Sequence, residues 1–306
     1  MTIQFLRNEY RSRINRVEDY IAENLSSEMR LDELAGIAAF SKYHFGRVFA
    51  MMTGETLFQY IQRMRVEKAA SLLLTNPGIS ITDAAFACGF CSSQAFSRSF
   101  RQRFDVSPSR WRELGGRTPE VQKRIQTRRR ENSTGTPDRE RILPKDLRII
   151  NSPDIEVSYL RYTGPFQGDT ELFSDLFGRL YRWADAKSLM GPETRSFCLV
   201  HDNPAITDDR KIRLSCCISV PGKTEPDREF GRMIIHGGKY ACAEFLINGH
   251  QYAQAWSYLY AQWLPSSGCQ PSDQPAFEEY PAPAENNSSA ADEKHRVLIW
   301  LPVRPL

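Results

Sequence analysis

Two adjacent carboxylates in the segment PAFEEY are the residues of this sequence best suited to hold a charged ligand. Glu278 and Glu279 stand inside a short apolar run. Because alternate residues of a strand share a face, Glu278 and Tyr280 should point one way and Phe277 and Glu279 the other. One carboxylate would then face inward, and an aromatic-lined hollow with an acid suits a lipophilic cation. A solvated edge strand would explain the same residues equally well.

Aromatic residues that could line such a hollow are spread over the second half of the chain, and most of them should belong to the core. The candidates for binding an effector are Glu278, Tyr280, Tyr240 and Trp300.

The sequence lacks the usual signatures of catalysis. It contains no glycine-rich phosphate loop, nucleophile elbow or H-E-x-x-H pair, and its five histidines are isolated. Cys88 and Cys91 form a C-x-x-C pair, but zinc would need a second pair and a thioredoxin-like site a preceding strand. We therefore interpret both cysteines as small apolar residues at a helix turn, with redox sensing as the alternative. No enzyme activity, metal or cofactor is expected.

A skeleton of apolar and small residues occurs twice before residue 115. Each copy places a short helix, a tight turn and a second helix within about 20 residues, which is helix-turn-helix spacing. The shift between copies is 50 residues, and 51 after a one-residue insertion. Pairs that match are Leu34 and Ala84, Phe40 and Phe90, Phe45 and Phe96, Arg47 and Arg98, and Phe49 and Phe100.

The second helix of each copy should bury its phenylalanines and turn polar side chains outward. Arg can bond guanine, and Gln adenine, through two hydrogen bonds each. A helical repeat used for protein contacts is the alternative, although two copies are few for such an array. The outward residues are Lys42, Tyr43, Gly46, Arg47 and Ala50 in the first copy and Ser93, Gln94, Ser97, Arg98 and Arg101 in the second.

The net charge of +3 conceals an asymmetry along the chain. Residues 1–130 contain 21 Lys and Arg against 13 Asp and Glu, whereas residues 131–306 contain 19 against 24. A basic first part suggests a polyanionic partner. No apolar run is long enough to cross a bilayer, and the N-terminal residues lack the apolar centre of a signal peptide. We expect a cytoplasmic protein without a membrane partner.

Composition and periodicity divide the chain into a helical part and a strand-rich part. Residues 116–146 are nearly devoid of large apolar residues and are predicted to be a linker. The sequence predicts a multi-domain protein, with an all-α double helix-turn-helix domain at 1–115 and an α+β domain at 147–306. Helices are expected near 9–25, 31–38, 41–52, 56–75, 80–88, 92–104 and 108–114.

After the linker, strand-like runs alternate with two amphipathic segments. The order is strand, helix and strands, followed by the same order again, which predicts an α+β domain built from two β-α-β-β repeats. The expected strands are IEVSYLRY, FCLVHD, RLSCCISV, KYACAEFLI, AFEEY and RVLIWLPV, and the expected helices start at Thr170 and Gln251.

Residues 8–113 resemble the DNA-binding domain of the AraC family of transcription regulators. The resemblance lies in Ser41-x-x-x-Phe45-x-x-x-Phe49, Thr53-Gly54, Gly89-Phe90, Phe96-x-x-x-Phe100 and Pro108-x-x-Trp111-Arg112. By position, it implies that Lys42, Tyr43, Arg47, Ser93, Gln94 and Arg98 contact bases. Asp105 stands where many members have glycine, and Asp tolerates a left-handed helix cap.

Residues 147–306 resemble the GyrI-like effector-binding domains. The matching pieces include His201-Asp202-Asn203-Pro204, Gly238-x-Tyr240-Ala241, Phe277-Glu278-x-Tyr280 and Leu301-Pro302-Val303. Such domains hold a ligand, often an amphipathic cation, between two repeats near a buried glutamate, and Glu278 matches that acid. The order of the two domains is similar to the Rob type of regulator, which implies control of drug-efflux or stress genes.

The sequence thus predicts a transcription regulator whose partners are double-stranded promoter DNA, a small, amphipathic or cationic effector, and RNA polymerase. As alternatives, the C-terminal domain is a hydrolase of electrophilic small molecules or a protein-interaction module attached to the DNA-binding domain.

Overall fold

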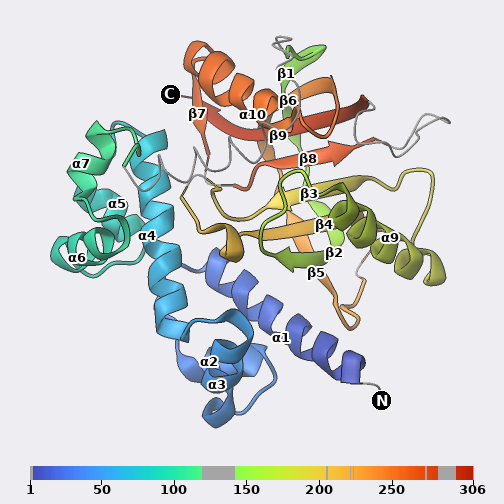
Figure 1. The fold of residues 1–306 in the computed structure, drawn as a ribbon, viewed down its shortest axis with the longest axis horizontal. Coiled ribbons are helices and arrows are strands. Elements are labelled where there is room, and N and C mark those ends of the chain that lie inside the picture. Colours follow the sequence, from blue (N-terminus) through green and yellow to red (C-terminus); the bar gives the residue numbers. More distant parts are fainter. Residues whose placement is uncertain are drawn as a thin grey trace. The chain divides into compact units, whose positions relative to one another are not determined.

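A computed structural model describes residues 3–118, 142–204, 206–220, 222, 224–272, 274–281 and 294–305. One compact unit contains helices α1 to α7, and a second contains the strands together with α9 and α10 (Figure 1). Residues 119–141 of the expected linker lie outside the described part. The domain limits 1–115, 116–146 and 147–306 therefore stay predictions.

The first unit consists of helices close to those predicted from periodicity. Figure 1 shows the long helix α4 running between α1 to α3 on one side and α5 to α7 on the other. The helices are α1 (Ile3–Glu23), α2 (Leu31–Ile37), α3 (Lys42–Thr53), α4 (Leu57–Thr75), α5 (Ile81–Ala87), α6 (Ser93–Phe104) and α7 (Pro108–Glu113).

Each helix-turn-helix unit has its own apolar core, and α4 belongs to both. Phe45 and Phe49 of α3 are fully buried against α1, α2 and the start of α4. Phe96 and Phe100 of α6 are buried in the same way against α5, α7 and the second half of α4. The inward faces predicted for both second helices are therefore confirmed, and their opposite faces are left for contacts outside the core.

The tight turn of each unit contains a residue in the left-handed region, but the two copies fill it differently. Ala39 has φ 52° in the first copy, and the corresponding residue of the second copy is Gly89, with φ +80°. A Cβ at Gly89 would lie 2.3 Å from the carbonyl oxygen of Leu25. Arg65 of α4 donates to that same oxygen at 2.8 Å. The turn of the second helix-turn-helix unit therefore packs directly against the first helix-turn-helix unit.

The second unit is a curled antiparallel sheet in the order β1-β6-β9-β8-β3-β4-β2-β5, with β7 paired to β9. Helix α9 (Thr170–Ala186) follows β2, and α10 (Tyr252–Tyr258) follows β6. The strands are β1 (Asp146–Ser152), β2 (Ile155–Thr163), β3 (Ser196–Val200), β4 (Arg213–Ser219), β5 (Phe230–Ile235), β6 (Gly238–Ile247), β7 (Cys269–Pro271), β8 (Phe277–Tyr280) and β9 (His295–Pro305).

Each repeat of the sheet is preceded by a strand that pairs with the other repeat. β2, α9, β3 and β4 correspond to β6, α10, β8 and β9, and the repeats meet where β3 pairs with β8. The strand before each repeat pairs with the other repeat, since β1 lies against β6 and β5 lies against β2. The predicted β-α-β-β duplication is thus present, with one extra exchanged strand per copy.

The two faces of the sheet carry separate cores. Helix α9 packs on Leu160, Cys198 and Cys216, and α10 packs on the corresponding strands of the second repeat, so both helices cover the same face (Figure 1). The opposite face is lined by buried residues of all the long strands, including Tyr159, Phe197 and Tyr240.

Candidate DNA-binding faces and effector site

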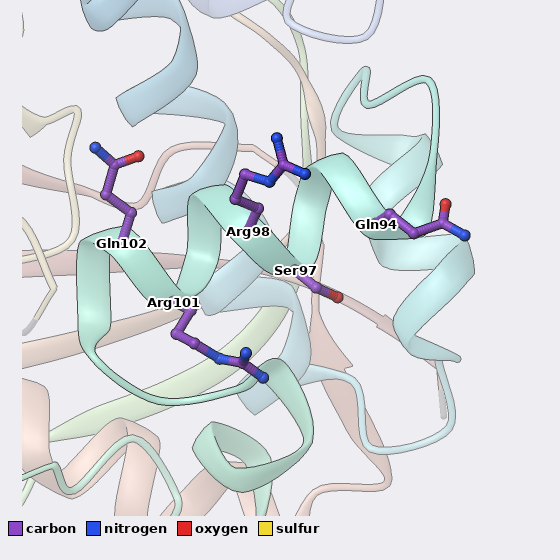
Figure 2. Close-up of a pocket in the computed structure, with 5 residues that line it drawn as sticks. All are labelled: Gln94, Ser97, Arg98, Arg101 and Gln102. Atoms are coloured by element: carbon purple, nitrogen blue, oxygen red, sulfur yellow. The ribbon is translucent and has the colours of Figure 1, made fainter.

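The outward face of α6 is a polar surface with two arginines. Gln94, Arg98 and Arg101 are exposed, and with Ser97 and Gln102 they line a shallow hollow along the helix (Figure 2). Figure 2 shows all five side chains extending outward from α6. This arrangement presents guanidinium and amide groups in the way a helix lying in a major groove requires.

The residues expected to contact bases differ in how exposed their side chains are. Lys42 and Arg47 are exposed on α3, as Gln94 and Arg98 are on α6. Ser93 is partly buried, and its hydroxyl lies 3.2 Å from that of Thr82 on α5, which reduces its freedom to reach a base. The side chain of Tyr43 lies outside the described part of the structure, so its predicted contact stays a prediction.

A buried ion network fixes α6 against α4. Glu67 of α4 pairs with Arg63 on the same helix at 3.2 Å and with Arg103 of α6 at 2.8 Å. Arg63 also pairs with Glu55, just before α4, at 2.9 Å. Removing one partner of such a buried network would leave an uncompensated charge, so the network ties α6 to α4.

Glu278 lies on the face of the sheet that α9 and α10 cover, between those helices. Its carboxylate accepts hydrogen bonds from Trp256 Nε1 of α10 at 2.8 Å and from the Tyr280 hydroxyl at 2.6 Å. The Tyr280 ring in turn contacts Phe177 of α9, with the centroids 5.7 Å apart. Glu278 and Tyr280 are each partly exposed, although their polar atoms lie deep enough for burial to shift their pKa values.

Glu279 faces the other way and is neutralised. Arg195 donates to both of its oxygens, at 2.7 and 2.8 Å, and Trp300 Nε1 donates at 2.9 Å. Only 6% of Glu279 is exposed. Glu278, by contrast, forms no ion pair with any residue that the structure describes. The predicted alternation places the two acids on opposite faces, and only Glu278 has no cation.

The four candidate effector residues separate into two pairs. Glu278 and Tyr280 lie together between the helices, whereas Tyr240 and Trp300 are buried on the opposite face of the sheet. There the two rings pack against each other, with centroids 5.9 Å apart. Tyr240 and Trp300 are therefore not brought to the Glu278 site.

The structure adds aromatic residues that sequence reasoning did not select. Three of them surround Glu278 and Tyr280: Trp256 and Tyr252 of α10 and Phe177 of α9. Cys198 of β3 lies opposite Glu278 in the sheet. The sequence contained one signal that could have identified these aromatics. They lie on the two amphipathic segments that follow the first long strand of each repeat.

Burial governs the titration of this site. It raises the pKa of the Glu278 carboxyl above its ordinary value, although the hydrogen bonds from Tyr280 and Trp256 oppose the rise. Burial also raises the pKa of Tyr280, Tyr252 and the Cys198 thiol, and the charge on Glu278 adds to each rise. Burial therefore disfavours the ionised form of Glu278, and a bound cation would stabilise that form.

The described residues contain no group of three or more His, Cys, Asp or Glu placed to hold a metal ion. Among the helices of the described ranges, none is both long and apolar enough to cross a membrane.

Known families match both units of the chain. A helix-turn-helix domain family matches residues 34–114, and the GyrI-like small molecule binding domain family matches residues 145–304. The TetD protein of transposon Tn10 from Escherichia coli is 39% identical over 94 residues, which are 30% of this chain and 67% of the relative. The transcriptional activator AarP of Providencia stuartii is 34% identical over 99 residues, 32% of this chain and 73% of the relative. Among solved structures, a cryo-EM structure of an EcmrR–DNA complex covers 91% of this chain and 100% of its own at 14% identity, with a TM-score of 0.45.

Two helix-turn-helix units joined in one chain to a small-molecule binding domain define a DNA-binding transcription regulator. The chain belongs to the AraC family of regulators and carries a C-terminal GyrI-like domain.

Proposed function

We propose that the protein is a one-component regulator that binds promoter DNA through the outward faces of α3 and α6 and an amphipathic cation at Glu278. The observation that carries the effector assignment is the contrast between two neighbouring glutamates. Glu279 has Arg195 as its partner, whereas the described residues offer Glu278 only neutral donors and aromatic rings. A lipophilic cation would supply the missing charge and stack on the rings.

The sign of regulation and the link to RNA polymerase also belong to this proposal. The name of the relative AarP describes it as a transcriptional activator, which favours activation here. A ligand changes DNA binding or polymerase contact only if its affinity differs between two states of the protein. The predicted drug or stress response follows if that ligand is a toxic amphipathic cation.

A hydrolytic role for the C-terminal domain has less support from the site. Cys198, which lies opposite Glu278 where β3 pairs with β8, is buried, and burial raises the pKa of its thiol well above the ordinary value. Because the thiolate is the reactive form, such a cysteine is a poor nucleophile. Recovery of the ligand unchanged after binding is the result expected of a sensor.

Tryptophan fluorescence of the full chain tests the effector assignment, since Trp256 bonds directly to Glu278. Tetraphenylphosphonium should quench saturably, and Glu278→Gln should weaken its binding at least tenfold, because the charge attraction in a partly buried site exceeds about 1.4 kcal/mol. The same substitution should reduce the affinity for neutral triphenylphosphine oxide far less. Glu171→Gln, which changes an exposed acid on α9, is the matched control. Equal losses for cation and neutral ligand would mean that Glu278 is structural.

A further inference from the structure

The outward face of α3 contains a glycine that the fold itself does not require. Gly46 lies inside the helix, where glycine is the least favourable residue after proline. Its backbone is not left-handed, and a Cβ there would meet no atom within 4 Å. Neither local conformation nor internal packing accounts for the glycine, which leaves the close approach of an outside molecule.

The internal repeat offers a direct comparison of the two reading faces. The α6 hollow contains two arginines and two glutamines, whereas the matching α3 positions keep one arginine and have small or apolar residues at three others. Met51 is 88% exposed, so its apolar atoms are accessible to another molecule. With the shift of 51, the residues Gln94, Ser97, Arg98, Arg101 and Gln102 correspond to Tyr43, Gly46, Arg47, Ala50 and Met51.

The major groove has one apolar feature that such a surface fits. The C5-methyl group of thymine projects into the groove and is contacted by alanine and other apolar side chains, whereas Arg and Gln bond guanine and adenine edges. Ala50 and Met51 provide apolar atoms beside Arg47, and Gly46 removes the side chain that would keep the α3 backbone away from the bases.

We propose that the two helix-turn-helix units read chemically different half-sites. The α6 face recognises guanine and adenine edges through Arg98, Arg101 and its glutamines. The α3 face recognises thymine methyl groups through Ala50 and Met51, at the short range that Gly46 permits. This assignment rests on the DNA-binding function proposed above for the two faces.

Deoxyuridine substitution tests the proposal because it removes only the methyl group. The full chain would first select a duplex from a randomised library, and each thymine of that duplex would then be replaced by deoxyuridine in turn. In one half-site, each contacted methyl should contribute about fourfold to affinity, from the usual value of one buried carbon. The other half-site should be insensitive to the replacement.

Variants that carry the residues of the second copy assign the sensitive half-site to α3. Ala50→Arg combined with Met51→Gln should abolish the deoxyuridine effect and make affinity fall more steeply with salt, because the new arginine can release a counterion. Phe58→Gln changes another exposed apolar side chain, on α4, and should leave the effect intact. Gly46→Ala should weaken DNA binding severalfold. The melting temperature of this variant should not fall, because the new Cβ meets no atom of the protein within 4 Å.

Equal affinity for thymine and deoxyuridine duplexes, with binding otherwise intact, would overturn the proposal and leave the DNA-binding function standing. Failure to select any duplex would overturn both. If Met51→Gln left affinity and deoxyuridine sensitivity unchanged but abolished transcription in vitro, the face would be a protein contact and the proposal would be wrong.

Discussion

Glu278 combines a raised pKa with a role that needs its charge, and this makes ligand affinity depend on pH. A cation binds the ionised carboxylate, so below the raised pKa of Glu278 binding must first remove a proton. Affinity for a lipophilic cation should therefore fall as the pH is lowered from neutral, by at most about tenfold per pH unit. Calorimetric titrations between neutral and mildly acidic pH measure this, and a neutral ligand should show no such loss. A flat profile for the cation would contradict the assignment.

The same raised pKa has a consequence for stability. A group whose pKa is higher in the folded state contributes stability at low pH that is lost as the pH rises through the folded value. Glu278 therefore costs the fold free energy at neutral pH, which is expected where a residue serves binding and not packing.

At the residue scale, the sequence predicted that Glu278 and Tyr280 share a face of the sheet, but it did not show that Tyr240 and Trp300 lie on the opposite face. Strand alternation correctly separates Glu278 from Glu279, because it depends only on neighbouring residues. Which face of the sheet Tyr240 belongs to depends on how β6 pairs with β9 and on how the sheet curls. That information comes from long-range pairing and is not present in the local pattern.

The helices of the first unit were predictable at the element scale because apolar spacing, breakers and caps agree. Ser92 and Ser107, for example, each accept a backbone N–H at the start of α6 and α7. Strands β1, β5 and β7 were not predicted. β1 and β5 lie at the edges of the sheet, and most residues of β1 are exposed or partly exposed, so it lacks a clear apolar alternation, whereas β7 has only three residues.

The left-handed turn of each helix-turn-helix unit permits a paired stability prediction. Ala39→Gly should raise the free energy of unfolding by about 1 kcal/mol, because it removes the Cβ strain of a left-handed residue. Gly89→Ala should lower the free energy of unfolding by about 2 kcal/mol or more. The new Cβ would clash with the Leu25 carbonyl oxygen, and alanine would also have to adopt an unfavourable left-handed φ. Urea unfolding of the two variants measures both changes. Shifts of the same sign would show that the two turns are not equivalent.

For the whole molecule, the exchange of β1 and β5 means that neither repeat of the sheet is complete alone. A protease site introduced between β4 and β5 should give two fragments that still elute together, because β1 pairs with β6 and β5 with β2. A fragment that begins at β1 and ends before β5, made separately and without the helical unit, should show no cooperative unfolding by circular dichroism. An independently folded first repeat would contradict this expectation.

The exchanged strands also set the timing of folding during synthesis. β1 leaves the ribosome long before Gly238–Ile247 has been made, and β2 must wait for β5, so the first repeat emerges with two unpaired edges. The helical unit, whose contacts are mostly between neighbouring helices, can fold meanwhile. A newly made chain should therefore be able to find DNA before it is able to sense a ligand.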